Sequence, residues 1–217
     1  MEKAGITNAD PSKILVLNGS QQALDFAGKV FLNEGDIALT ERPSYPGALN
    51  AFRWSMPRYV DVTTDSQGMV PEALEEALRK TPEARMIYVI PNFQNPTGIT
   101  MGVERRKALA RIAASHDIPL LEDNPYGELR FEGECLPSVK SFDEAGNVLC
   151  TGTFSKIFCP GYRIGWIAGG KEIIRQYVLV KQGTDLQCNT IAQMEIAKFL
   201  ELHDIDEHIE KIRVIYK

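Results

Sequence analysis

Residues 151–166 read TGTFSKIFCPGYRIGW and hold the most specific pattern in the chain. They follow the apolar run Val148–Thr151, which we predict to be a buried strand. A lone lysine on a loop is usually solvated. Here the lysine has hydroxyl neighbours, and an arginine follows a glycine-containing turn: the four side chains are Thr153, Ser155, Lys156 and Arg163. This combination suits an amine that forms a Schiff base beside a bound phosphate.

Short apolar runs alternate with longer helical patterns along the chain, which is typical of β-α units around a mainly parallel sheet. We predict seven strands, at Ile14–Leu17, Asp36–Leu39, Arg58–Val62, Met86–Ile90, Pro119–Glu122, Val148–Thr151 and Arg163–Ala168. Helical patterns occupy Gln21–Leu32, Gly47–Trp54, Pro71–Arg79, Val103–His116 and the stretch from Lys171 onward. The polar run Thr63–Gly68 is predicted to be a loop. The expected fold is a three-layer α/β/α domain with a mainly parallel seven-stranded sheet.

The composition is that of an ordinary globular domain. The chain has 217 residues, of which 44% are hydrophobic and 24% are charged, so disordered and fibrous classes are excluded. The net charge is -5, and the 24 lysines and arginines are scattered along the sequence, which argues against a nucleic-acid partner. This length accommodates one large domain or at most two small ones.

Several features predict a cytoplasmic protein. The longest apolar runs, such as Ile14–Leu17, are far too short to span a membrane, and the first five residues hold no apolar signal region. The four cysteines form no Cys-x-x-Cys pair, so we expect neither a disulfide scaffold nor a secreted protein. The three histidines show no paired ligand spacing, and we expect no metal site.

Ligands of open α/β sheets bind beyond the carboxyl ends of the strands, so the polar residues that follow each strand are candidates for a site. After the first strand, Ser20 and Gln21 open a helix whose N-terminus favours an anion, although a serine there is also an ordinary helix cap. Tyr45 follows the second strand on a proline-flanked loop. Its ring suits stacking on a planar ligand, or anchoring of the loop itself.

Two further segments add hydrogen-bonding groups. Asn95 follows the fourth strand within Asn-Pro-Thr-Gly, which is first of all a turn sequence but offers an amide to a ligand oxygen. Asp123 comes where the fifth apolar run ends. A carboxylate there suits a helix cap, an ion pair, or a partner that holds a proton on a heterocyclic nitrogen.

These five segments, in this order, resemble the large, cofactor-binding domain of fold type I pyridoxal-phosphate enzymes of the class I and II aminotransferase family. The branch with kynurenine and 2-aminoadipate aminotransferases is the most similar, and the resemblance runs from about Ile14 to at least Leu200. It implies that Lys156 binds the aldehyde of pyridoxal 5'-phosphate, that Asp123 faces the pyridinium nitrogen and that Tyr45 stacks on the ring. Asn124 departs from the second aspartate that close relatives often carry.

The resemblance also implies the other cofactor contacts. Asn95 and Tyr126 would bind the phenolic oxygen of the cofactor. The phosphate would be surrounded by five side chains: Ser20, Gln21, Thr153, Ser155 and Arg163. Thr153 stands where many relatives have serine, which keeps the hydroxyl.

Family members are considerably longer, with an N-terminal arm and a C-terminal small domain. The resemblance therefore implies that residues 1–217 are a large domain that lacks both, with 189–217 as the start of the helix that leads to the small domain. The helical pattern Ile191–Lys217 ends without a capping glycine or proline, as expected of a truncated segment or of a natural terminal helix that frays; the resemblance favours truncation.

The activity implied is transamination between an amino acid and a 2-oxo acid in a full-length homodimer, with this fragment inactive by itself. A pyridoxal-phosphate-dependent lyase would use the same residues. A sensor domain of a transcription regulator is an alternative of another class. Such sensors commonly carry a His-Gln-aromatic-Pro run where this chain has Phe93–Pro96, and the retained Asn95 favours an enzyme. A degenerate scaffold fits poorly with five intact motifs.

Overall fold

A seven-stranded sheet forms the centre of the fold in a computed structural model that describes residues 4–6 and 10–217. The strand order is β1-β9-β8-β7-β6-β2-β3. The strands are β1 (Ile14–Leu17), β2 (Ile37–Glu41), β3 (Arg58–Val62), β6 (Ala84–Val89), β7 (Leu120–Asp123), β8 (Val148–Thr153) and β9 (Gly165–Ala168). Neighbours from β8 to β3 are parallel, whereas β9 runs antiparallel to both β8 and β1. The predicted mainly parallel sheet is confirmed.

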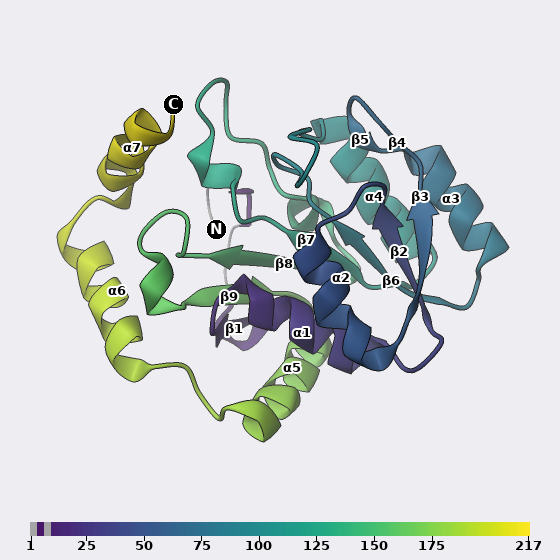
Figure 1. Cartoon of the computed structure of the whole chain (residues 1–217), viewed down its shortest axis with the longest axis horizontal. Helices are drawn as coiled ribbons and strands as arrows, with labels where there is room; N and C mark the ends of the chain where they lie inside the picture. The colour runs from purple at the N-terminus through teal and green to yellow at the C-terminus, as the bar shows by residue number, and fades with distance from the viewer. Residues whose placement is uncertain (1–3, 7–9) are drawn as a thin grey trace.

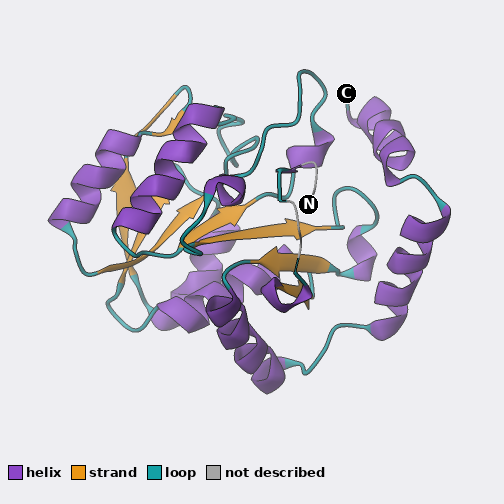
Figure 2. Cartoon of the chain, turned by 180° about the vertical axis from the view of Figure 1, so that it is seen from behind, coloured by secondary structure: helices purple, strands orange, loops and turns teal. Residues whose placement is uncertain are grey.

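Helices cover both faces of this sheet, with α1, α2 and α5 on one face and α3 and α4 on the other (Figures 1 and 2). The helices are α1 (Ser20–Phe31), α2 (Pro46–Phe52), α3 (Pro71–Lys80), α4 (Val103–Ser115), α5 (Lys171–Thr184), α6 (Thr190–Leu202) and α7 (Ile205–Tyr216). The predicted three-layer α/β/α architecture is therefore present.

Side chains that point alternately to the two faces of the central strands form the two core layers. In β2, Ala38 packs with the cluster beneath α1, while Ile37 and Leu39 pack with the cluster beneath α3 and α4. In β6, Tyr88 packs with the cluster beneath α1, and Ile87 packs with the cluster beneath α3 and α4. Because successive strand residues point to opposite faces, a strand covered on both sides is apolar at nearly every position.

The structure corrects four predicted elements. The predicted loop Thr63–Gly68 contains a short hairpin, β4 (Thr64–Asp65) paired with β5 (Gly68–Met69). Arg163, predicted to begin the last strand, instead follows a 3-10 turn with a left-handed backbone (φ 53°). β7 and β8 extend further than predicted, so that Asp123 and Thr153 are their last residues.

The C-terminal pattern forms separate helices rather than a single one. Asp204 caps α7 by accepting a hydrogen bond from the Asp206 amide, and the helical backbone is interrupted there, between α6 and α7. Both helices lie along one side of the molecule, away from the sheet (Figures 1 and 2). Ala192 and Ile196 of α6 pack on Ile164. Within the described residues, no helix is both long and apolar enough to cross a membrane.

Candidate active site

One cavity lies where the parallel strands end, and it gathers all ten side chains predicted for the site. Its lining includes Ser20, Gln21, Tyr45, Asn95, Asp123, Tyr126, Thr153, Ser155, Lys156 and Arg163. Its volume is about 160 Å³, similar to that of an engineered cavity that accepts benzene. The cavity therefore has room for a single planar ring, at the edge of the sheet where α/β folds bind ligands.

One part of this cavity is suited to an anion. Helix α1 begins at Ser20, so its first amides have no partner within the helix and carry the positive end of the helix dipole. Arg163 Nη1 donates a hydrogen bond to Ser155 Oγ at 3.2 Å, and Thr153 Oγ1 accepts one from the Ser155 amide at 3.1 Å. A guanidinium, two hydroxyls and a helix N-terminus together match a phosphate group.

Two glycines allow the backbone to pack closely here. Gly19 has φ +76°, and a Cβ on it would lie 2.7 Å from Arg163 Nη2. A Cβ on Gly165 would lie 2.7 Å from both the Gly19 carbonyl carbon and the Ser20 amide nitrogen. Only glycine at position 165 lets β9 lie this close to the start of α1.

Asp123 is a buried carboxyl group with one oxygen free for a ligand. Tyr88 Oη donates a hydrogen bond to Asp123 Oδ2 at 2.9 Å. Asp123 Oδ1 is buried and has no hydrogen-bond partner among the described residues. Burial raises the pKa of Asp123 to about 7, against the opposing effect of the Tyr88 hydrogen bond. A cationic N–H placed beside Oδ1 would satisfy that oxygen and stabilise the charged carboxylate.

Loops supply the amine and the aromatic groups. Lys156 is exposed, and its Nζ lies 5.8 Å from the centroid of the Tyr126 ring. Burial, with Tyr45 and Asp123 nearby, raises the pKa of Tyr126, and a hydrogen bond with the Asn95 side chain partly offsets this. The Tyr45 ring lies against Gly47, where any Cβ would clash with it. The amine and two tyrosine rings thus share one opening.

Sequence reasoning missed the buried residues that hold these loops. Gln94 is 3% exposed, and its Nε2 donates to the Pro43 carbonyl at 2.8 Å, which ties the Asn95 loop to the Tyr45 loop. Glu41 Oε2 accepts from the Ile90 amide at 2.9 Å, and burial raises the pKa of Glu41 to about 7. A polar residue at the end of an apolar strand is the signal that could have pointed to Glu41 and Gln94. Their hydrogen-bond partners could not be identified, because they lie about 50 residues away in sequence.

The residues present fit a ligand with an anionic group, a planar ring and a basic ring nitrogen. The anion would occupy the space beside Ser20 and Arg163, and the ring nitrogen would satisfy the unpartnered Asp123 Oδ1. Lys156 supplies a primary amine to the same cavity. This is the donor set that pyridoxal 5'-phosphate requires.

Known proteins resemble this chain over almost its whole length. The family model for aminotransferase class I and II matches residues 2–213. The aromatic-amino-acid aminotransferase 1 of Thermococcus litoralis is 46% identical over 208 residues, which are 94% of this chain and 50% of that relative. The crystal structure of Pyrococcus horikoshii kynurenine aminotransferase in complex with PMP superposes with a TM-score of 0.90 and 43% identity, covering 94% of this chain and 51% of that one.

A relative of a different kind also matches. An uncharacterized HTH-type transcriptional regulator of Bacillus subtilis, YisV, is 34% identical over 206 residues, which are 95% of this chain and 42% of the regulator. The chain spans about half the length of the curated relatives it matches. With the family model covering nearly every residue and the strand ends meeting at one cavity, the chain belongs to the class I and II aminotransferase family.

Proposed function

We propose that this chain is the cofactor-binding part of a pyridoxal-phosphate-dependent aminotransferase, which transfers an amino group between an amino acid and a 2-oxo acid. The observation that carries the proposal is the cavity itself. It brings Lys156 together with an anion site and with the buried, unpartnered Oδ1 of Asp123. The aminotransferases that match the chain, one of them in complex with PMP, the pyridoxamine form of this cofactor, support it.

Each residue has a separate task in this reaction. The bound cofactor supplies an electron-accepting ring that makes the α-proton of an amino acid acidic. Lys156 Nζ, free once the amino group of the substrate has taken its place, would remove this proton and return it to the carbon on the other side of the substrate nitrogen. Asp123 keeps the ring nitrogen protonated, because a carboxylate beside a nitrogen favours its charged form. Tyr45 covers one face of the ring and excludes water from it.

The remaining cavity residues hold the cofactor in place. Ser20, Gln21, Thr153, Ser155 and Arg163 would hold the phosphate, with the charge of Arg163 and the α1 dipole opposing its negative charge. Asn95 and Tyr126 would bind the phenolic oxygen of the ring. Fixed at both ends, the ring would present its aldehyde carbon to Lys156.

Lysine trapping tests this assignment. Adding pyridoxal 5'-phosphate to the purified chain should give a visible absorbance band, and borohydride should then fix the cofactor on Lys156, as peptide mass mapping would show. The Lys156→Ala variant should lose the band. Lys171→Ala, which removes an exposed lysine at the start of α5, is the matched control and should keep it. Mapping of the label to any other lysine would refute the role of Lys156.

A sensor domain of a transcription regulator is the second candidate, because an HTH-type regulator is among the relatives. The full-length protein separates the two functions. An aminotransferase forms oxo acids from a panel of amino acids, whereas a sensor binds the cofactor and DNA without forming them. The Asn95 side chain, retained at the cavity, favours the enzyme.

We also propose the setting in which the enzyme works. The full-length protein would be a cytoplasmic homodimer, in which residues 1–217 form the large domain and 189–217 lead into a small domain. The four cysteines are free, which is common in a reducing compartment. Helices α6 and α7 lie apart from the sheet and expose large apolar side chains, including Met194, Leu202 and Ile215. Such a surface suits burial against further protein.

A further inference from the structure

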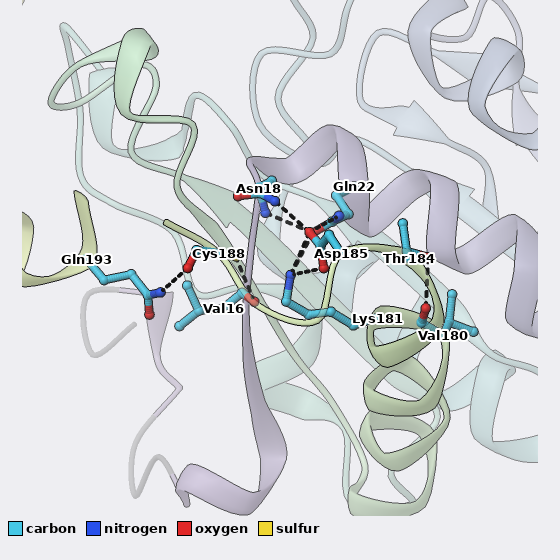
Figure 3. A network of polar contacts seen from close by, with 9 residues as sticks. All are labelled: Val16, Asn18, Gln22, Val180, Lys181, Thr184, Asp185, Cys188 and Gln193. Carbon is cyan, nitrogen blue, oxygen red and sulfur yellow. Dashed lines mark hydrogen bonds and ion pairs between the residues drawn. The ribbon is translucent and has the colours of Figure 1, made fainter. Parts of the chain in front are cut away.

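An acidic residue far along the chain is hydrogen-bonded to both ends of the turn that opens α1. Asp185 Oδ2 accepts from Asn18 Nδ2 at 2.6 Å and from Gln22 Nε2 at 2.8 Å. Asp185 lies just after α5, whereas Asn18 and Gln22 flank the junction of β1 and α1 (Figure 3). The two contacts bridge 167 and 163 residues of sequence.

The Lys181 ammonium completes this network. Lys181 is 5% exposed, and its Nζ lies 2.8 and 3.0 Å from the two carboxylate oxygens of Asp185. It also donates to Gln22 Oε1 at 3.2 Å, and the same oxygen accepts from the Asn18 amide at 2.9 Å. The side-chain oxygen and nitrogen of Gln22 both have hydrogen-bond partners, so the network fixes the Gln22 rotamer together with the first turn of α1.

The turn held by this network is the one that faces the phosphate site. Gly19, Ser20 and Gln21 lie between Asn18 and Gln22, and both Ser20 and Gln21 line the cavity. The Gly19 amide donates to the Leu17 carbonyl and the Gln22 amide to the Gly19 carbonyl. The amides of Ser20 and Gln21 have no partner inside the helix and are therefore available to an anion.

The charge of the phosphate explains why Asp185 is paired with Lys181 beside the turn 18–22. An unpaired carboxylate near the phosphate would repel it. Lys181 neutralises Asp185 within 3 Å, so the carboxylate orients the turn at little electrostatic cost to the anion site. Burial raises the pKa of Asp185, but the hydrogen bonds from Gln22, Lys181 and Asn18 outweigh this and lower it, so the carboxylate stays ionised at neutral pH.

We propose that Asp185 is a positioning residue for the phosphate site: with Lys181 it holds the turn 18–22 so that the start of α1 keeps its place beside Arg163. This inference rests on the proposed function, since it takes the anion to be the phosphate of the cofactor. Asp185 does not line the cavity that holds the predicted cofactor residues, so it acts through Asn18 and Gln22.

Two ligands that differ only in the phosphate isolate the effect. Pyridoxamine phosphate and pyridoxamine bind without forming a bond to lysine, and calorimetry gives the ratio of the dissociation constant of pyridoxamine to that of pyridoxamine phosphate. Asp185→Asn should reduce this ratio about tenfold, because a hydrogen-bonded charge that orients the turn is lost. The affinity for pyridoxamine itself should change less than about twofold. A purely structural role would instead weaken both ligands alike.

Asp25→Asn is the matched control, because Asp25 forms an i,i+4 ion pair with Lys29 on α1 and does not contact the turn. It should leave the ratio unchanged. Asn18→Ala, which removes one contact from the side of the turn, should also lower the ratio and serves if Asp185→Asn fails to fold. If the wild-type chain prefers pyridoxamine phosphate while neither Asp185→Asn nor Asn18→Ala changes the ratio, that result overturns the role of Asp185 and leaves the proposed function intact. A wild-type chain without any preference overturns both.

Discussion

Asp123 shows how a single residue can prepare a site at the expense of stability. The residue is 2% exposed, and one oxygen of its carboxyl group has no hydrogen-bond partner among the described residues. Burial keeps the group protonated to about pH 7 in the folded chain, whereas an unfolded aspartate ionises near its ordinary value of 3.8. Between these two pH values the folded state binds the extra proton, so this group makes the free energy of unfolding fall as the pH rises.

Asp123→Asn should therefore stabilise the chain, and more at pH 8 than at pH 5. The amide removes the cost of a buried charge and still offers an oxygen to Tyr88. We expect the gain in unfolding free energy to be larger at pH 8 by about 2.5 kcal/mol, as measured by urea denaturation without cofactor. Asp61→Asn, on an exposed aspartate of β3, is the control, because it removes a carboxylate that is not buried. An equal gain at both pH values would contradict the raised pKa.

Elements with strong local signals were predictable from the sequence, and elements that depend on distant partners were not. Buried strands such as β6 and β8 read as apolar runs, and they were located to within a few residues. The hairpin of β4 and β5 was missed because strands of two residues have no periodicity. The break at Asp204 was missed because the apolar pattern of α6 continues into α7. A helix-capping aspartate before α7 was the available signal.

The contact between β9 and the start of α1 gives a prediction at this scale. Gly165→Ala would place a Cβ against backbone atoms of Gly19 and Ser20, which cannot move without displacing α1. We expect a loss of about 2–3 kcal/mol in unfolding free energy, together with weaker binding of pyridoxamine phosphate.

Gly183→Ala is the matched control for this substitution. Gly183 lies in α5, and beyond its chain neighbours and the adjacent backbone of that helix no atom lies within 4 Å of the position that its Cβ would take. Alanine there should raise the free energy of unfolding by about 0.5 kcal/mol, because it favours the helix. Equal effects of the two substitutions in thermal or urea denaturation would show that the α1–β9 contact tolerates a side chain.

At the scale of the whole molecule, the residues that line the cavity were predictable, but the network that supports them was not. The ten lining residues follow strand ends, and their order along the chain resembles one family. Asp185 and Lys181 carry no local signal, because a Lys and an Asp four residues apart occur on many exposed helices. Only the packing of α5 against α1 brings them to the turn.

The chain by itself should have negligible transaminase activity, even though the cavity is formed. Several large apolar side chains of α6 and α7 remain exposed, among them Ile191, Met194, Leu202, Val214 and Ile215, and Lys156 is open to solvent. Without further protein to orient an amino acid over Lys156, turnover should fall at least about 100-fold. An assay of oxo-acid formation should compare the chain with the full-length protein. Comparable turnover would contradict this expectation.

The place of β1 at the edge of the sheet has a consequence for synthesis on the ribosome. Among the strands that the structure describes, β1 pairs with β9 alone, so that Ile14 lies opposite Ala168, and the turn after β1 is fixed by Asp185. Ser20 is translated long before residue 185, but it cannot take its place until the chain has grown past that residue. Closing so long a loop is entropically costly and slow. A nascent chain thus has no phosphate pocket until most of these 217 residues have emerged. The cofactor can therefore bind only to chains in which the synthesis of this domain is nearly complete.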